Sequence, residues 1–510
     1  MYFISTRGGE KVTGAQAIVQ GLAKNGGLYV PETFPTVTAE EMTAMMEMNY
    51  PERAALVLGK YLADDLGADF LKEVCEKAYA TFEGDDPVPL VKIDGELYVL
   101  ELFHGPTCAF KDVALTVLPY LLKKSCEVTG IKEEIMILTA TSGDTGKAAL
   151  EGFRDVPGVK VAVFYPDEGV AKMQRLQMCI QDGNNVFVSA VKGNFDDCQR
   201  AVKKLFSSEE FNADLAKKNI RLSSANSINF GRLAPQIAYY FSAYLDLVSS
   251  EQIEMGDEID FVVPTGNFGD ILAGWYAKQM GLPVRKLVCA SNRNKVLADF
   301  FAKGEYDVKR NFFRTMSPSM DILVSSNLER LLFEVSGRNA ELTASRMKQL
   351  AEQKYYAITT EEKAKIDRDF VGGFASEDDT VEAMYGVFDE YGYAMDTHTG
   401  VALAVYDSYK LAIDTEDHPD KTPIVVLSTA NPYKFPQDVL YALSGNDVKD
   451  SFKGIKRLNL LTAMKPPKCL LELRYRPLRF KTVVANDLQK MAAEVMKFAD
   501  GEIIPVPDEK

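Results

Sequence analysis

The sequence predicts an α/β protein with a mainly parallel sheet, and two observations lead to this prediction. From about residue 96, short runs rich in Val, Ile and Leu alternate with segments of helical periodicity. This alternation is typical of βαβ units, whose parallel strands are covered by helices on both faces. In addition, glycine-containing turns follow two of the runs, as expected where a strand leads into a helix. The runs are ELYVLEL (96–102), EIMILTA (134–140), VKVAVFYP (159–166), NVFVSAV (185–191), EIDFVVP (258–264) and VRKLVCAS (284–291).

The segments before and after this region have a different pattern. Residues 1–85 predict helices with one Pro-containing connection, GGLYVPETFP. Beyond residue 440, the segment 456–480 predicts a short strand-like element, and 487–498 predicts a terminal helix. The helices predicted in the first segment are 13–24, 38–48 and 51–82.

Composition argues against several classes of protein. The chain has 510 residues, of which 46% are hydrophobic, and a formal net charge of −15, which argues against general binding to nucleic acid or anionic membranes. The apolar stretches are shorter than a membrane span, and the first residues lack the pattern of a secretory signal, so we expect a cytoplasmic protein. The seven cysteines form no C-x-x-C pair and there are three histidines, which argues against a disulfide framework and against a metal site.

Two glycine turns follow predicted strands, at the sheet edge where ligands bind in such folds. They are TSGDTGK (141–147) and TGNFGD (265–270). Their small residues let backbone N–H groups converge at a helix start and bind a phosphate or carboxylate, although each turn is also compatible with a plain tight connection. A P-loop is excluded because Thr141 and Ala148 stand where it requires Gly and Ser or Thr, and neither turn contains G-x-G-x-x-G.

Lys111 stands in an unusual place for a lysine. It ends the stretch ELFHGPTCAFKD, residues 101–112, between alternating apolar residues and an apolar helical run. An ammonium in apolar surroundings reaches water, finds a partner or loses its charge, and a neutral lysine is a nucleophile. A lysine together with an anion-binding turn suggests pyridoxal phosphate, whose aldehyde condenses with lysine while the protein holds the phosphate.

Five blocks of the sequence resemble the threonine synthase family, pyridoxal-phosphate enzymes of fold type II, and a sixth block matches less closely. The resemblance covers most of the first 440 residues and thins beyond them. It implies two three-layer sheet domains with the cofactor in the cleft between them. The blocks are TGAQAIVQGLAKNGGLYVP (13–31), ELFHGPTCAFKD (101–112), LTATSGDTG (138–146), SANSINFGRLAPQ (224–236), PTGNFGD (264–270) and, less closely, LSTANPYKF (427–435).

We expect three parts on this basis. A helical N-terminal domain spans residues 1–90. A catalytic domain pair spans 91–440, with a smaller sheet subdomain at about 110–235 inserted in the larger one. A C-terminal extension over 441–510 packs on the large domain.

The resemblance implies the residues that hold the cofactor. Lys111 is the catalytic Schiff-base lysine, which moves protons once the substrate has displaced it. Thr429 places a neutral hydroxyl at the pyridine nitrogen, with a helix N-cap as the alternative. The phosphate-cradling loop is Gly266, Asn267, Phe268, Gly269 and Asp270.

The resemblance also implies the residues that bind the substrate. Arg232 is the candidate for gripping a phosphate, because its planar fork binds bidentately. The alternatives are a polar helix start with a solvent-facing Arg232, and a His398 that is a hydrogen-bonded surface residue. The substrate-binding candidates are Ser142, Asp144, Thr145, Asn226, Ser227, Asn229, Arg232 and His398.

The implied activity is the last step of threonine biosynthesis. O-phospho-L-homoserine and water give L-threonine and phosphate, by γ-elimination of phosphate and β-addition of water through an imine at Lys111. One alternative is a phospholyase that releases 2-oxobutyrate, ammonia and phosphate, and another is a non-catalytic relative that only binds a ligand. We expect this small-molecule substrate as the partner, no nucleic acid, no membrane and no metal, and a monomer or homodimer.

Overall fold

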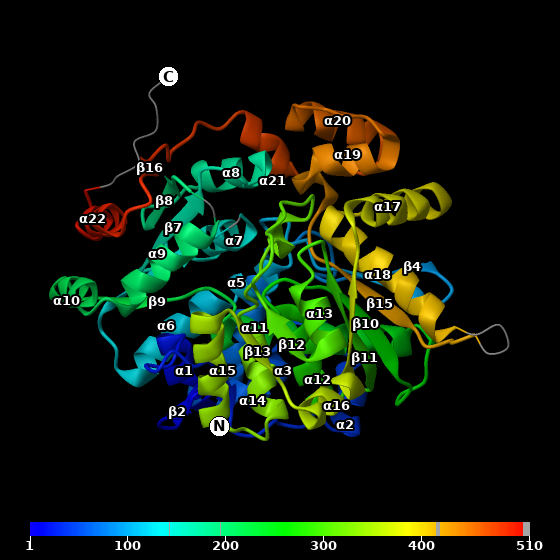
Figure 1. Ribbon diagram of the computed structural model, residues 1–510, viewed down its shortest axis with the longest axis horizontal. Helices are drawn as coiled ribbons and strands as arrows, with labels where there is room; N and C mark the ends of the chain where they lie inside the picture. Colours follow the sequence, from blue (N-terminus) through cyan, green and yellow to red (C-terminus); the bar gives the residue numbers. More distant parts are fainter. Residues whose placement is uncertain (142, 194, 415–418, 503–510) are drawn as a thin grey trace.

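The computed structural model describes residues 1–141, 143–193, 195–414 and 419–502 and has an α/β fold, as the sequence predicts. A larger sheet of six strands and a smaller sheet of five strands lie next to each other, with helices around both (Figure 1). Among the described residues, we find no helix with the length and apolar character needed to cross a membrane.

The larger sheet has the strand order β14-β11-β10-β15-β5-β4. All neighbouring strands run parallel except β4, which runs antiparallel to β5 at one edge. The strands are β4 (Leu90–Asp94), β5 (Leu97–Glu101), β10 (Ile259–Pro264), β11 (Val284–Ser291), β14 (Phe370–Phe374) and β15 (Ile424–Ser428).

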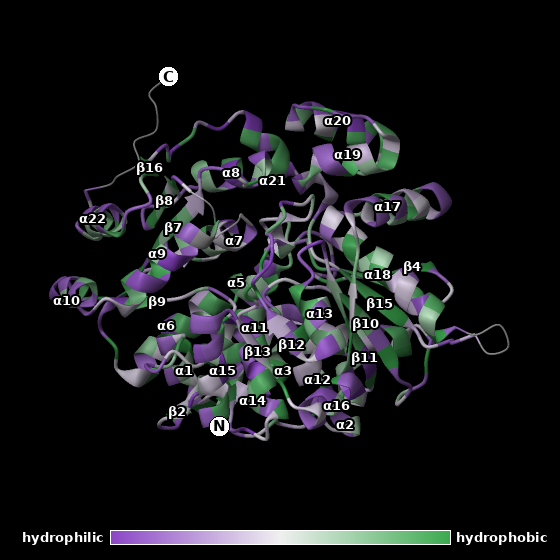
Figure 2. Ribbon diagram, viewed as in Figure 1, coloured by the Kyte–Doolittle hydropathy of each residue, from purple (hydrophilic) through white to green (hydrophobic). Residues whose placement is uncertain are grey.

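Both faces of the larger sheet are covered, because consecutive residues of a strand point to opposite faces. On β10, Phe261 and Val263 belong to the core on the side of α11 and α12, whereas Val262 belongs to a second core on the side of α18. The central strands are therefore continuous apolar runs, and Figure 2 shows β10 and β15 mostly in the hydrophobic colour. The helices are α11 (Phe230–Ser249), α12 (Gly269–Gln279), α17 (Glu377–Tyr391) and α18 (Thr397–Ile413).

The smaller sheet is parallel throughout, with the order β16-β8-β7-β6-β9. Helices α7 and α9 pack against its strands. The strands are β6 (Glu134–Ala140), β7 (Val159–Pro166), β8 (Val186–Val191), β9 (Ile220–Ser223) and β16 (Val483–Val484), and the helices are α7 (Asp144–Gly152), α8 (Lys172–Cys179), α9 (Phe195–Ser207) and α10 (Glu209–Lys217).

The N-terminal region is helical, as expected, but it also contains a small antiparallel sheet that the sequence did not indicate. This sheet has the order β2-β1-β3, and its strands are stabilised by partners elsewhere in the chain: the buried ring of Phe3 lies 4.6 Å from that of Phe230. The elements of this region are β1 (Tyr2–Ser5), β2 (Val12–Thr13), β3 (Tyr29–Pro31), α1 (Gly14–Gln20), α2 (Ala39–Met45), α3 (Tyr50–Leu66) and α4 (Ala68–Tyr79). Further along the chain, α5 (Lys111–Leu115) and α6 (Leu118–Thr129) lie between β5 and β6.

A mixed region lies between β11 and α17 and supplies one wall of the cavity described below. It contains the antiparallel strand pair β12 and β13, whose stacked rings of Tyr306 and Tyr356 have centroids 5.2 Å apart. Its elements are α13 (Val296–Lys303), β12 (Glu305–Asp307), η1 (Pro318–Met320), α14 (Leu328–Val335), α15 (Ala340–Gln353), β13 (Tyr355–Ala357) and α16 (Thr360–Asp369).

The C-terminal extension corrects two expectations. Segment 456–480 contains the end of α20, then α21 and η3, rather than a strand-like element, and buried Ile455 and Leu458 share one face of α20. The extension does not pack on the large domain throughout: β16 pairs with β8, and α22 packs on α9. The physical reason is that β8 would otherwise be an open edge with unpaired backbone groups. The elements are η2 (Pro432–Lys434), α19 (Pro436–Ser444), α20 (Ser451–Thr462), α21 (Lys468–Leu471), η3 (Glu472–Arg474) and α22 (Leu488–Ala499).

A pair of glycine substitutions tests the close packing of α5 against α7. A Cβ at Gly152 would lie 2.1 Å from the carbonyl oxygen of Leu115, so we expect Gly152→Ala to lower the free energy of unfolding by roughly 1–3 kcal/mol. At Gly59, in α3, the nearest atom would be 4.0 Å away, so Gly59→Ala should raise it by about 0.5–1 kcal/mol. Urea denaturation of both variants measures the difference, and equal effects would contradict the packing.

Candidate active site

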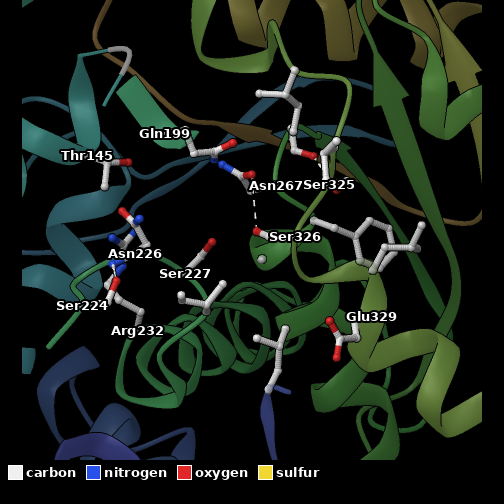
Figure 3. A pocket seen from close by; sticks show the side chains of 18 of the residues that line it. Thr145, Gln199, Ser224, Asn226, Ser227, Arg232, Asn267, Ser325, Ser326 and Glu329 are labelled. Atoms are coloured by element: carbon white, nitrogen blue, oxygen red, sulfur yellow. Dashed lines mark hydrogen bonds between the residues drawn. The ribbon is translucent and has the colours of Figure 1, made fainter. Parts of the chain in front are cut away.

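A cavity of about 810 Å³ lies where strand ends of the two sheets meet. Its walls include residues that follow β6 of the smaller sheet and residues that follow β10 and β15 of the larger sheet. Ligands bind at this edge in open α/β sheets. Figure 3 shows Asn226, Ser227, Arg232 and Asn267 among the polar side chains around the cavity.

Lys111 lines this cavity at the first position of α5. The loop before it is fastened to the segment after β15, because the N–H of Phe110 donates to the carbonyl oxygen of Thr429 at 2.9 Å and the N–H of Asn431 donates to that of Cys108 at 3.1 Å. Burial lowers the pKa of Lys111 to about 8, although the carboxylate of Asp144 acts in the opposite direction. About a tenth of the amine is therefore neutral and nucleophilic at pH 7.

Asp144, at the start of α7, is shared by two lysines. Its Oδ2 lies 3.8 Å from Nζ of Lys111, and its Oδ1 lies 2.7 Å from Nζ of Lys434, whose side chain is fully buried. Gln174 Nε2 donates to Oδ1 at 2.8 Å, and the hydroxyl of Ser319 donates to Oδ2 at 3.1 Å. Burial by itself raises the pKa of Asp144, but the ammonium groups of Lys434 and Lys111 outweigh it and hold the pKa well below its usual range.

The glycine turn at 265–270 brings the N-terminus of α12 to the cavity. A Cβ at Gly266 would lie 2.9 Å from the carbonyl oxygen of Ser319, so this position has no room for a side chain. Phe268 has a left-handed φ of +63°, and its ring is buried. Gly269 and Asn267 also line the cavity, so the turn exposes backbone to the cavity at the positive end of the helix.

The carboxylate of Asp270 is hydrogen-bonded to two tyrosine side chains. Its Oδ1 accepts hydrogen bonds from the hydroxyls of Tyr239 at 2.5 Å and Tyr240 at 2.8 Å. Burial raises the pKa of Asp270 to about 6, against the effect of these bonds and of Lys111. A carboxylate side chain repels a phosphate. Asp270 therefore contributes to an anion site through its backbone in the first turn of α12, not through its side chain.

Arg232 is buried in α11 and lines the cavity, so the alternative of a solvent-facing arginine is wrong. One terminal nitrogen donates to the carbonyl oxygen of Ala225 at 2.8 Å, while Nε is buried with no hydrogen-bond partner among the described residues. Burial lowers the pKa of Arg232 to about 10, which leaves it charged at neutral pH. A buried guanidinium with an unused N–H is suited to bind an anion.

Two of the other polar residues near Arg232 face the cavity. Asn226 accepts a hydrogen bond from the hydroxyl of Thr139 at 2.7 Å, and Ser227 accepts one from Nδ2 of Asn327 at 2.9 Å. Both residues line the cavity, and their contact with a substrate stays a prediction. Figure 3 shows Asn226 and Arg232 on the same wall.

The expectation that Asn229 contacts the substrate is contradicted. Asn229 is the N-cap of α11, where its Oδ1 accepts from the N–H of Gly231 at 2.9 Å. Its Nδ2 donates to the carbonyl oxygens of Ile18 and Ser224 at 3.0 and 3.1 Å. Both ends of the amide are therefore used to cap α11 and to tie it to α1, and the residue is not part of the cavity wall.

His398 is buried rather than on the surface. Its Nδ1 lies 2.8 Å from Oδ1 of Asp396, so Nδ1 carries the hydrogen, and its Nε2 accepts the N–H of Ser319 at 3.1 Å. The ring thereby holds η1 against the cavity. Thr145 and Thr429 line the cavity, and Thr429 is not a helix N-cap because Asn431 caps the following η2. Ser142 lies outside the described residues.

Several residues of the site were not found from the sequence, among them Lys434, Ser319 and Gln199. Lys434 lies in the sixth resemblance block, so its place there was a signal, but only the folded chain shows that its ammonium reaches Asp144 and, at 2.9 Å, the carbonyl oxygen of Thr107. Ser319 and Gln199 come from segments with no motif, and Figure 3 shows Gln199 directed toward the cavity near Asn267.

Comparison with known proteins covers nearly the whole chain. Family models match as "Threonine synthase N terminus" over residues 2–79, "Pyridoxal-phosphate dependent enzyme" over 82–429 and "Threonine synthase, C-terminal" over 399–495. Threonine synthase from Pseudomonas aeruginosa is 38% identical, over 97% of this chain and 98% of that protein. The chain belongs to the threonine synthase family. The resemblance therefore extends beyond residue 440, where the sequence blocks thinned out.

Other members of the threonine synthase family differ in length. Threonine synthase-like 1 from Homo sapiens is 37% identical over 96% of this chain, but the chain spans only 66% of that protein's length. The crystal structure of PLP bound threonine synthase from Brucella melitensis matches with a TM-score of 0.85 and 36% identity, over 98% of this chain and 99% of that one. The fold-type II architecture of this chain is thus that of solved threonine synthases.

Pyridoxal phosphate is the cofactor, as the sequence predicts, and the residues present fit it. Lys111 offers a buried amine with a lowered pKa for the aldehyde. The turn beginning at Gly266 offers a helix N-terminus with no room for side chains, which suits a phosphate. Both face one cavity large enough for a cofactor and a small substrate.

The second lysine of the site yields a pH-dependent prediction. The positive charge of Lys434 helps to lower the pKa of Lys111, so Lys434→Met should raise that pKa above about 8. The rate at which added pyridoxal phosphate develops its lysine-bound visible absorbance depends on neutral amine, and its pH midpoint should therefore move upward.

A buried lysine outside the cavity provides the control. Lys147, also in α7, pairs with Glu151 at 3.0 Å, and Lys147→Met should leave the pH midpoint unchanged. An unchanged midpoint in Lys434→Met would show that Lys434 does not set the charge state of Lys111.

Proposed function

We propose that this protein converts O-phospho-L-homoserine and water into L-threonine and inorganic phosphate, the last step of threonine biosynthesis. The observation that carries the proposal is that one cavity is lined by Lys111, by Gly266 in the turn before α12 and by the buried guanidinium of Arg232. A phosphorylated amino acid and a phosphorylated cofactor need two separate anion sites, and the cavity offers two.

Lys111, the turn from Gly266 to Asp270 and Thr429 are the residues that we assign to the cofactor. When bound, pyridoxal phosphate stabilises the negative charge left on a carbon that loses a proton. The turn binds the phosphate through backbone N–H groups, and the hydroxyl of Thr429 serves the pyridine nitrogen without requiring that it be charged. The pocket walls around Lys111 exclude water from the amine, which is why its pKa is lowered.

Lys111 is then the group that moves protons. With a pKa of about 8, its Nζ accepts a proton from the substrate carbon and returns one later near neutral pH. Asp144 supports this exchange, because its ionised carboxylate, 3.8 Å from Nζ, stabilises the ammonium form. Lys434 keeps Asp144 ionised and in place from the other side.

We assign other residues of the cavity wall to the substrate. We assign the phosphate of the substrate to Arg232, with Asn226 and Ser227 beside it, and the amino-acid end to Thr145. Ser142 stays a prediction from the sequence for the same amino-acid end. His398 positions η1 through the N–H of Ser319 rather than contacting the substrate through a free ring nitrogen. The cytoplasmic location and the monomeric or dimeric state stay predictions.

Replacement of Lys111 tests the central assignment. We expect Lys111→Ala to lose the release of threonine and phosphate by at least about 100-fold, because the variant lacks the amine that transfers the proton. The measurement is product analysis of the holoenzyme with O-phosphohomoserine, with Lys123→Ala, an exposed lysine in α6, as the control that keeps activity.

The products of the unaltered protein separate the alternatives. Threonine and phosphate released together support the proposal. Phosphate with 2-oxobutyrate and ammonia, without threonine, would make the protein a phospholyase. No product from a protein that binds the cofactor would make it a non-catalytic relative.

Loss of the buried guanidinium should weaken phosphate binding. Because a hydrogen bond to a charged group contributes about 1.5–3 kcal/mol, we expect Arg232→Gln to raise the Kd for inorganic phosphate by about tenfold or more in the holoenzyme. Arg221→Gln, at an arginine on β9 whose side chain is 45% exposed and paired with Glu133, is the matched control. Calorimetric titration with phosphate gives both values, and an unchanged Kd in Arg232→Gln would remove the assignment.

A further inference from the structure

Two cysteines that are far apart in the sequence meet beside the active-site lysine. The Sγ atoms of Cys108 and Cys469 lie 3.3 Å apart, although 361 positions separate the residues. Cys108 is buried in the loop that leads to Lys111, and Cys469 is partly exposed in α21 of the C-terminal extension. The reaction proposed above uses neither thiol, so the contact calls for an explanation of its own.

We propose that Cys108 and Cys469 form a reversible disulfide that ties the C-terminal extension to the loop carrying Lys111. The sequence argued against a disulfide framework because the seven cysteines are scattered and form no local pair. The fold creates this pair by bringing α21 against the loop before α5. A thiol pair of this kind is an oxidation site rather than a structural crosslink, since one of the two residues, Cys469, is partly exposed.

The chemistry requires an oxidant, and a small peroxide is the class that fits a half-buried site. The sulfur of Cys469 attacks one oxygen of hydrogen peroxide, the O–O bond breaks, and a sulfenic acid and one water form. The sulfur of Cys108 then attacks the sulfenic sulfur, the S–S bond forms, and a second water leaves. Two thiols lose two electrons and two protons, and the peroxide is reduced to two waters.

Cys469 is the better first nucleophile of the two. It is the more exposed residue, and the hydrogen bond with Cys108 holds the pKa of its thiol below the usual value. A thiolate is the form that reacts with peroxide. Cys108 is buried and is already in contact with the sulfur that it would attack, so it acts as the resolving thiol.

The geometry indicates which side would move. Bond formation brings the two sulfurs from 3.3 Å to about 2.05 Å. The backbone of Cys108 is held at both ends, because its N–H donates to Gly105 at 3.0 Å and its carbonyl oxygen accepts from Asn431 at 3.1 Å. Cys469 lies in a helix of four residues. The shift therefore falls mainly on α21, and Lys111 keeps its place.

The disulfide would act as a strap between the two sheets. After α21, the chain is bound to the smaller sheet: the N–H of Arg479 donates to Cys179 at 2.9 Å, and the N–H of Ala190 donates to Thr482 at 2.9 Å. Figure 1 shows α21 beside α8, with the chain continuing to β16. Cys108, in contrast, is bonded to the segment after β15 of the larger sheet. A bond between the two limits opening of the cavity between the sheets.

Peroxide treatment of the holoenzyme tests the pair. We expect the loss of two of the seven thiols, a peptide in which Cys108 and Cys469 are linked in the non-reducing mass spectrum, and full recovery of both thiols with dithiothreitol. We also expect the oxidised holoenzyme to lose pyridoxal phosphate more slowly in cofactor-free buffer, because the strap hinders opening. None of these readouts depends on threonine formation, so failure of the proposed reaction leaves the result intact.

Two variants make the test specific. Cys469→Ser should form no link, and peroxide should not slow its cofactor loss, whereas Cys126→Ser, at the other partly exposed cysteine, should behave as the unaltered protein does. If Cys469→Ser does not fold, the test rests on the unaltered protein: the Cys108–Cys469 peptide must form with peroxide and disappear with dithiothreitol. Peroxide products confined to Cys469, or links between other cysteines, would overturn the pair. A link without slower cofactor loss would overturn the strap.

Discussion

The buried carboxylate of Asp144, held between the ammonium groups of Lys111 and Lys434, is the interaction on which the active site depends. It crosses the cleft: Asp144 follows β6 of the smaller sheet, whereas Lys434 follows β15 of the larger one. Two buried positive charges around one negative charge stay in apolar surroundings only while the carboxylate is ionised. Burial lowers the pKa of Lys111 to about 8 while Asp144 favours its ammonium form, so the amine can gain and lose a proton near neutral pH, which is the property that its chemistry needs.

The topology explains why these groups meet at all. Parallel strands point their carboxyl ends toward one edge, so the turns after β6, β10 and β15 come together although long segments separate them. The C-terminal extension closes the arrangement, because it leaves the larger sheet and returns to the smaller one as β16. Lys111, its ionic partner Asp144 and the contact of Cys108 with Cys469 therefore lie in the same small region of the fold.

Much of the fold could be predicted because buried parallel strands appear in a sequence as continuous apolar runs. The runs 134–140 and 159–166 coincide with β6 and β7. The Gly-containing β14 and the two-residue β2 and β16 could not be predicted, because their pairing depends on distant partners rather than on their own composition. In the site, Asn229 was misassigned because an asparagine that caps a helix and one that binds a ligand look alike in a sequence.

The sequence by itself determined the α/β class, the two glycine turns at strand ends and the place of Lys111 next to an apolar helix, because local pattern is enough to specify these. Only the tertiary structure decided that Arg232 is buried with an unused N–H, that Lys434 shares Asp144 with Lys111 and that Cys108 touches Cys469. Burial, ion pairing and thiol contact depend on the distance between atoms that the chain brings together from far apart, and no local pattern of residues records that distance.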